Sequence, residues 1–101
     1  MSETKLELIG EAKGIKDGVY TGEGSGFRGL IFVEVTIKDE LIINVEVVEN
    51  REDIRWFNRA NDVVPELIVS EQSTDVDTVS GATYSSWGII KATKDALDSV
   101  G

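Results

Sequence analysis

The chain is short and acidic and contains neither histidine nor cysteine. It has 101 residues, of which 41% are hydrophobic, and a formal net charge of −9 at pH 7. That length suits one small domain with one hydrophobic core. The missing residue types exclude Ser-His-Asp and Cys-His catalysis, thiol redox chemistry, and zinc or iron–sulfur sites built on those side chains. The acidic balance argues against binding of nucleic acid.

The N-terminal part predicts one glycine-rich strand after an indistinct start. Residues 1–16 mix charged and apolar positions, and we expect a weak strand or a loose lead-in there. Residues 17–27 alternate in the manner of a strand. Within them, Gly22, Gly24 and Gly26 indicate bulges, tight turns, or a place where another backbone or a ligand comes close.

Two clear strands follow, over residues 30–38 and 41–49. The residues expected to share one face of the first strand are Ile31, Val33, Val35 and Ile37. Those expected to share one face of the second strand are Leu41, Ile43, Val45 and Val47. Because only Asp39 and Glu40 separate the two strands, we expect an antiparallel hairpin.

The C-terminal half changes to helical spacing. Residues 54–60 contain a helix-like apolar pair, Trp56 and Phe57. Asp62 is typical of a helix N-cap and Pro65 of a first helical turn, which predicts a short helix over residues 62–70. The residues expected on its buried side are Val63, Leu67 and Ile68. Residues 71–76 are expected to form an extended link.

The strongest helical pattern runs from Trp87 to Val100. Its recurring positions are Trp87, Ile90, Lys91, Lys94, Leu97 and Val100, widened by Ile89, Thr93 and Ala96. Since strands come first and helices second, we expect an α+β fold in which an antiparallel sheet carries the helices on one face. We expect residues 1–101 to form a single domain.

Residues 77–83 form the segment that most directly indicates chemistry. They read Asp77-Thr-Val-Ser-Gly-Ala-Thr83, a hydroxyl-rich turn that leads into the last helix. The first N–H groups of a helix lack internal partners and the helix dipole favours an anion there, so this turn can hold a phosphate. It also suits an ordinary helix start with Ser80 or Thr83 as N-cap and Gly81 as turn residue. By spacing alone, the ordinary helix start is the better interpretation.

The same segment resembles the flavinylation motif of the FMN-binding domain family. The family pattern is Asp, two variable residues, Ser or Thr, Gly, Ala, and Thr or Ser, and the matching residues here are Asp77, Ser80, Gly81, Ala82 and Thr83. The stretch that begins Asp17-Gly-Val-Tyr also resembles the opening strand of that family. The resemblance covers about residues 14–100 and leaves 1–13 as a lead-in. Family members include the NqrC and RnfG subunits of ion-coupled redox complexes and modules of fumarate-reductase-like flavoproteins.

The resemblance implies that the Thr83 hydroxyl is esterified to the phosphate of FMN. A separate flavin transferase that uses FAD and a divalent metal would form this bond. Gly81 and Ala82 leave room for the transferase and the phosphate, and the N–H groups of residues 83–86 can hold the remaining phosphate charge. Asp77 is recognised by the transferase or orders the turn. Ser80 and Ser85 bond to the phosphate or cap the helix.

The residues that contact the flavin ring are less defined. Tyr84 is a candidate because it follows the attachment residue. The other aromatic candidates, for each of which core packing is the default interpretation, are Tyr20, Phe27, Trp56 and Trp87. The glycines of the first strand can let the ring approach, although a role in turns or bulges is the simpler interpretation.

The expected function is electron transfer by a domain that carries covalent FMN. The cofactor supplies the redox chemistry, and the protein attaches, orients and tunes it. The expected partners are the flavin transferase, an electron donor and an electron acceptor, with membranes contacted only through partners. The resemblance suggests an extracytoplasmic or membrane-associated location in bacteria. Two alternatives stay open: non-covalent binding of FMN or another phosphate, and a structural or interaction domain that is never flavinylated.

Overall fold

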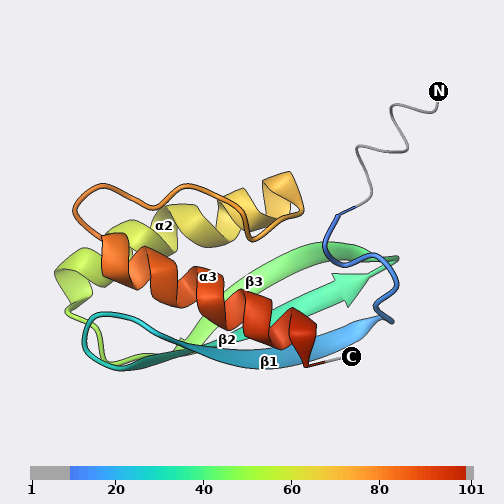
Figure 1. Ribbon diagram of the computed structural model, residues 1–101, viewed down its shortest axis with the longest axis horizontal. Coiled ribbons are helices and arrows are strands. Elements are labelled where there is room, and N and C mark those ends of the chain that lie inside the picture. The colour runs from blue at the N-terminus through green and yellow to red at the C-terminus, as the bar shows by residue number, and fades with distance from the viewer. Residues whose placement is uncertain (1–9, 100–101) are drawn as a thin grey trace.

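A three-stranded antiparallel sheet carries two helices on one face (Figure 1). The structure is a computed structural model and describes residues 10–99. Its strands, adjacent in chain order, are β1 (Gly18–Ser25), β2 (Leu30–Lys38) and β3 (Leu41–Glu49). They are followed by the helices α2 (Ile54–Glu71) and α3 (Thr83–Asp98). The expected α+β class is therefore confirmed.

The middle strand β2 supplies one side of the core. Ile31, Val33, Val35 and Ile37 are all buried, while the residues between them are partly exposed, as the alternation predicts. The hairpin turn is also confirmed. Asp39 and Glu40 both have positive φ, 54° and 61°, which is the conformation of a type I′ turn and suits the twist of the two strands.

In β3 the expected buried face is wrong at its start. Ile37 pairs with Ile42, but the preceding Thr36 pairs with Asn44, so Ile43 is an extra residue in the ladder. This bulge reverses the alternation. As a result Ile42 is buried and Ile43 is 48% exposed, whereas the expected Val45 and Val47 do face the core. A bulge is invisible to a strict period of two, which explains the error.

The second half of the chain forms one long α2 where two segments were expected. Asp53 is its N-cap and accepts a hydrogen bond from the N–H of Arg55 at 3.0 Å. Asp62 is thus a mid-helix residue, and its prediction as an N-cap is wrong. Pro65 also lies inside the helix, where it removes a backbone hydrogen bond.

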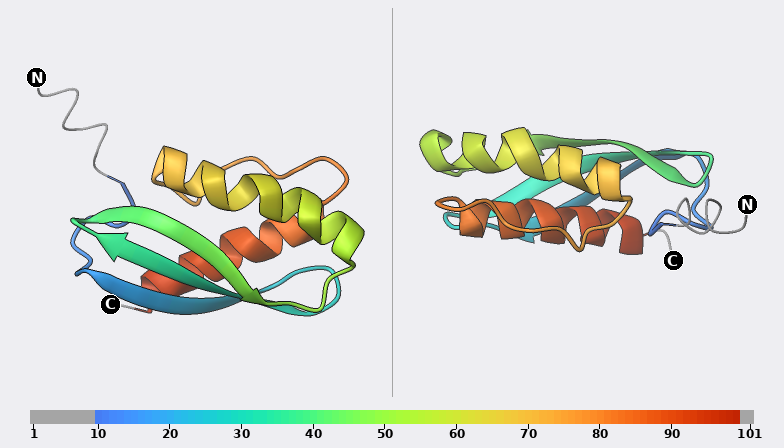
Figure 2. Two further views of the ribbon diagram at one scale, coloured as in Figure 1. Left: turned by 180° about the vertical axis from the view of Figure 1, so that it is seen from behind. Right: turned by 90° about the horizontal axis from the view of Figure 1, so that it is seen from above.

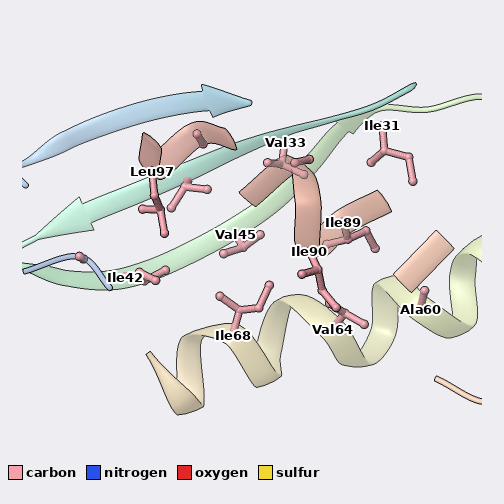
Figure 3. Packing of buried hydrophobic residues seen from close by; sticks show 14 of the residues in the cluster. Ile31, Val33, Ile42, Val45, Ala60, Val64, Ile68, Ile89, Ile90 and Leu97 are labelled. Carbon is pink, nitrogen blue, oxygen red and sulfur yellow. The ribbon is translucent and has the colours of Figure 1, made fainter. Parts of the chain in front are cut away.

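Burial on both sides of Pro65 keeps α2 continuous. Val64 and Ile68 are completely buried, and Figure 3 shows them pointing toward the sheet and α3. Val63, expected on the buried side, is 41% exposed, while Leu67 is half-buried and Ile68 is buried as expected. Tertiary packing therefore overrides the local signal of the proline.

The helix α3 lies against β1 and β2, with α2 beside it along β3 (Figure 2). Its buried residues include Ile89, Ile90, Thr93, Ala96 and Leu97, as expected. Trp87 is half-exposed and Lys91 and Lys94 are exposed, so the predicted stripe is wrong at those positions. Val100 lies outside the described residues.

The glycines of β1 allow the backbone of α3 to approach the sheet closely. A Cβ added to Gly22 would lie 2.1 Å from the carbonyl oxygen of Ala92, and one added to Gly24 would lie 2.6 Å from the oxygen of Gly88. Of the alternatives raised by the sequence, close approach of another backbone is the one observed at these two positions.

The lead-in is fastened at the end of the molecule away from the start of α3. Most of the expected lead-in, residues 1–9, lies outside the described residues, and residues 11–14 form a turn. The Glu11 carboxylate accepts hydrogen bonds from the hydroxyls of Ser73 and Thr74 and from the Thr74 N–H, each at 2.8 Å. Burial raises the pKa of Glu11, but these bonds lower it by more, so its pKa lies below the ordinary value.

No helix between residues 10 and 99 is long and apolar enough to cross a membrane.

Candidate functional site

Three segments distant in sequence form a pocket at one end of the molecule. The turn after β1, the start of α2 and the start of α3 all lie at this end (Figures 1 and 2). The residues that line the pocket are Phe27, Glu52, Asp53, Trp56, Gly81, Ala82, Thr83, Tyr84 and Ser85. Five of the seven predicted cofactor residues are therefore brought together. Asp77 and Ser80 are exposed and do not line the pocket.

The start of α3 offers unpaired N–H groups without a side-chain cap. Ala82 is the N-cap residue and has no capping side chain, so the prediction of Ser80 or Thr83 as N-cap is wrong. The first intrahelical bond runs from the N–H of Ser86 to the carbonyl of Ala82 at 2.9 Å. The N–H groups of residues 83–85 precede that bond and point toward the helix start, where an anion is favoured.

Two features of the local chain shape this helix start. Gly81 has a φ of +83°, a left-handed conformation that costs other residues energy. The buried Ser86 hydroxyl donates to the carbonyl of Ala82 at 2.8 Å and accepts from the N–H of Val79 at 3.0 Å. Ser86 thus holds the turn in place from inside the protein. Nothing in the sequence distinguished this role of Ser86 from that of its neighbour Ser85.

Thr83 is exposed at the first position of α3 and is one of the residues that line the pocket. Its hydroxyl forms no hydrogen bond within residues 10–99 of the structure. Ser85 differs, because it is 3% exposed and its hydroxyl donates to Glu52 Oε1 at 2.8 Å. The Ser85 hydroxyl is therefore engaged with protein, and Thr83 has the accessible hydroxyl of the two.

Glu52 joins the three segments of the pocket and was not recognised from sequence. Its carboxylate accepts the N–H of Phe27 at 2.8 Å and that of Arg28 at 2.7 Å, besides the Ser85 hydroxyl. Burial raises the pKa of this carboxyl, but the hydrogen bonds lower it by more, so the pKa lies below the ordinary value of 4.5. Gly26 leaves the room it needs, since a Cβ there would lie 2.5 Å from Glu52 Oε1.

Three exposed aromatic side chains line the pocket. Phe27 is 67% exposed, Tyr84 63% and Trp56 43%, and the rings of Phe27 and Tyr84 lie 5.5 Å apart at 40°. Exposed aromatic rings gain by covering a flat apolar ligand. The other ring candidates, Tyr20 and Trp87, do not line this pocket.

Arg59 adds positive charge beside Gly81 and was also missed. Its Nη1 lies 3.0 Å from the position that a Cβ on Gly81 would take, and its guanidinium lies 5.4 Å from the centre of the Trp56 ring. Arg55 lies over the same ring at 5.7 Å, but it forms an ion pair with Asp53. No motif links an arginine on α2 to the segment 77–83, so only the fold could reveal this proximity.

The residues of the pocket fit a ligand that has both a phosphate and a flat ring. The free N–H groups of α3 and Arg59 suit the phosphate, while both carboxylates that line the pocket are already bonded to donors. The pocket volume of about 190 Å³ is smaller than that of sites which enclose a whole ligand. FMN held here would keep part of its ring exposed. No group of three potential metal-binding side chains occurs among residues 10–99.

Comparison with known proteins finds relatives that match most of this chain. The chain is 41% identical over 83 residues to an uncharacterized protein of Treponema pallidum (strain Nichols), 35% over 82 residues to a urocanate reductase of Eggerthella lenta, and 32% over 84 residues to an NADH:acrylate oxidoreductase of Vibrio harveyi. These alignments cover 82%, 81% and 83% of the chain, but only 23%, 14% and 8% of the respective relatives. The chain thus corresponds to a small part of each.

A family match gives the final evidence. The FMN-binding domain family matches residues 26–98, which include β2, β3, both helices and every residue that lines the pocket. Because this match covers most of the chain, the chain belongs to the FMN-binding domain family.

Proposed function

We propose that this FMN-binding domain carries its cofactor through a phosphoester to Thr83 and relays electrons between redox partners. The observation that carries the proposal is the exposed, unbonded hydroxyl of Thr83 at the first position of α3, in the lining of a pocket with aromatic residues. It lies at the end of the motif that begins at Asp77. A phosphate esterified there meets the N–H groups of the first helical turn.

The attachment is a transfer from FAD that conserves atoms and charge. The Thr83 oxygen attacks the phosphorus on the riboflavin side of FAD, a new phosphorus–oxygen bond forms, and the pyrophosphate bond breaks. AMP leaves, and the hydroxyl proton passes to a base of the flavin transferase. No electrons are exchanged in this step. Bound FMN then supplies the redox chemistry, while the protein holds its phosphate and leaves part of its ring accessible.

A relay role suits a domain that forms a small part of larger relatives. A urocanate reductase and an NADH:acrylate oxidoreductase are both named for redox reactions, and this chain matches only 14% and 8% of them. We infer that the chain supplies the carrier step and that donor and acceptor are other domains or proteins. Asp77, which does not line the pocket, is then recognised by the transferase or orders the turn.

Co-expression with a flavin transferase, followed by intact-mass measurement, tests the attachment. The wild-type chain should gain the mass of one FMN less one water, and Thr83→Ala should gain nothing. Thr83→Ser should keep the modification because it retains a hydroxyl. Thr78→Ala is the matched control, since it removes a threonine hydroxyl at a variable position of the motif.

The alternatives give different results in the same experiment. Flavin that binds wild type and Thr83→Ala alike and is lost on denaturation would show non-covalent binding. A chain that acquires no flavin in either form would be a structural or interaction domain. Either result would overturn the covalent proposal.

A further inference from the structure

We propose that the end of the domain around the pocket is a docking surface for an acidic region of a redox partner protein. That the partner is a redox protein rests on the proposed function, whereas the location of the docking surface is inferred from the distribution of charge. The chain contains four arginines and six lysines. All four arginines lie at the pocket end.

Each arginine is placed there by a separate contact. Arg28 follows Phe27 in the turn after β1, where its N–H bonds to Glu52. The pKa of Asp53 is lowered mainly by the hydrogen bonds from Arg55, and the charge of Arg28 adds to this effect. Arg51 lies against that turn, with its Cβ and Cδ each 3.9 Å from where a Cβ on Gly29 would be. The guanidinium groups of Arg55 and Arg59 both lie over the Trp56 ring, 5.7 and 5.4 Å from its centre. All four side chains are exposed.

The two carboxylates that line the pocket are already bonded to other groups of the protein. They therefore do little to neutralise the positive charge that the arginines present to solvent. Glu52 is turned inward to two N–H groups and a hydroxyl, and Asp53 is paired with Arg55. Three arginines, Arg28, Arg51 and Arg59, thus form no ion pair within residues 10–99. The combination of arginine with exposed aromatic side chains is typical of protein interfaces.

Three of the lysines lie in different surroundings from the arginines. Lys91 and Lys94 line a surface hollow together with Glu23, Asp95 and Asp98. Lys16 lines another with Asp17, Asp39 and Glu40. Acidic groups therefore offset the charge of these three lysines, and a net charge of −9 makes the remainder of the domain repel an acidic partner. Attraction at one end and repulsion elsewhere would orient the partner toward the pocket and its cofactor.

The charges favour a protein partner over an anionic membrane. Each basic residue near such a membrane contributes only about 1 kcal/mol. A net charge of −9 opposes the approach of the whole domain to a large negative surface. A protein with a local acidic patch can meet the arginines without facing the rest of the domain.

NMR titration of the chain with a short poly-L-glutamate peptide tests the surface. The titration uses Thr83→Ala, so that the result does not depend on flavinylation. At low salt we expect amide shifts at residues 26–29, 51–59 and 81–85, which weaken as salt is added. Arg28→Gln with Arg51→Gln should lower the affinity about fivefold. The matched control, Lys13→Gln with Lys16→Gln, removes the same charge and should lower it less than about twofold.

Four results would overturn the proposal. They are an absence of binding at low salt, shifts centred on other residues, equal losses in the two double variants, and arginine-dependent binding to phosphatidylglycerol vesicles that exceeds binding to the peptide. The wild-type mass gain on co-expression is measured separately. Failure of docking therefore leaves the flavinylation result standing, and failure of flavinylation leaves the docking result standing.

Discussion

The first turn of α3 and its later turns meet the rest of the molecule in opposite ways. In the first turn, Thr83 and Tyr84 are exposed, and Ser85 reaches Glu52 through a single hydrogen bond. Farther along, the backbone at Ala92 and Ala96 lies so close to β1 that the facing position, Gly22, has no room for a side chain. One helix therefore combines an accessible start with a tightly packed body.

The contrast shows how a small domain can present a reactive group on rigid backbone. The close contact with β1 fixes α3 on the sheet, so its first turn is held in place without being buried. Thr83 and Tyr84 are consequently free of packing demands, and their side chains can serve chemistry and binding. We expect substitutions in the packed body to act on stability and substitutions at the helix start to act on flavinylation.

The largest expected effect is that of Gly22→Ala on stability. Its Cβ would lie 2.1 Å from the carbonyl oxygen of Ala92 and 2.4 Å from the nitrogen of Ala96, both backbone atoms of α3. The helix would have to move away from the sheet, which should lower the free energy of unfolding by about 3 kcal/mol or more. Urea unfolding measured by circular dichroism gives this value.

Gly81→Ala is the matched change at the helix start. Its strain at a φ of +83° should cost about 1–2 kcal/mol, while the added Cβ meets only the flexible end of Arg59. The yield of flavinylated protein should fall for this folded variant. A larger loss of stability for Gly81→Ala than for Gly22→Ala would contradict the comparison.

A smaller effect is expected from Glu52→Gln, which replaces the carboxylate that joins the pocket segments by a neutral amide. Loss of charge-assisted bonds to Phe27, Arg28 and Ser85 should lower the stability at neutral pH by about 1–2 kcal/mol. The folded pKa of Glu52 lies below its ordinary value of 4.5, so its stabilisation is present above that value and is lost as the pH falls through the folded pKa. The variant should therefore show a flatter dependence of stability on pH below about 4.5.

Glu11→Gln is the control for Glu52→Gln at the opposite end. The pKa of Glu11 is lowered in the same direction by bonds to Ser73 and Thr74, so its pH dependence should flatten in the same way. Only Glu52→Gln should reduce flavinylation, because only Glu52 lines the pocket. Urea unfolding at several pH values and intact mass separate the two roles. Equal flavin yields in both variants would show that Glu52 does not contribute to flavinylation.

The smallest expected effect is that of Arg59→Gln on the rate of flavinylation. Arg59 lies against Gly81, where its charge can attract the phosphate, so its loss should slow the reaction about two- to fivefold. Arg55→Gln removes an equal charge over the same Trp56 ring but from a residue already paired with Asp53, and should change the rate less. A time course of intact mass compares them. Equal slowing would mean that only the overall charge matters.

Local patterns predicted the elements wherever one period governs the whole segment. The alternation in β2 correctly placed Ile31 and Val35 in the core, and the two-residue turn between β2 and β3 predicted their pairing. The pattern failed at Ile43, where a bulge shifts the period, and at Asp62, where a capping residue lies inside a longer helix. In both places the favourable arrangement depends on partners elsewhere in the chain.

The residues of the candidate site likewise fall into two groups, those that the sequence could identify and those that it could not. Gly81, Ala82, Thr83, Tyr84 and Ser85 are consecutive, so their motif could be found from the sequence alone, and all of them line the pocket. Glu52 and Arg59 belong to a different segment and match no motif, so their roles could not be read locally. Phe27 and Trp56 were candidates only as aromatic residues, and the fold distinguished them from Tyr20 and Trp87.

The sequence by itself determined the three strands, the helix after the motif and the segment that ends at Thr83, because backbone pairing, helical spacing and a contiguous motif are local properties. Only the tertiary structure decided which distant groups surround Thr83. Close packing at Gly22 sets the position of α3, and the bonds of Glu52 bring the turn after β1 to the helix start. The pocket is therefore a consequence of packing between segments, which no single segment of the chain encodes.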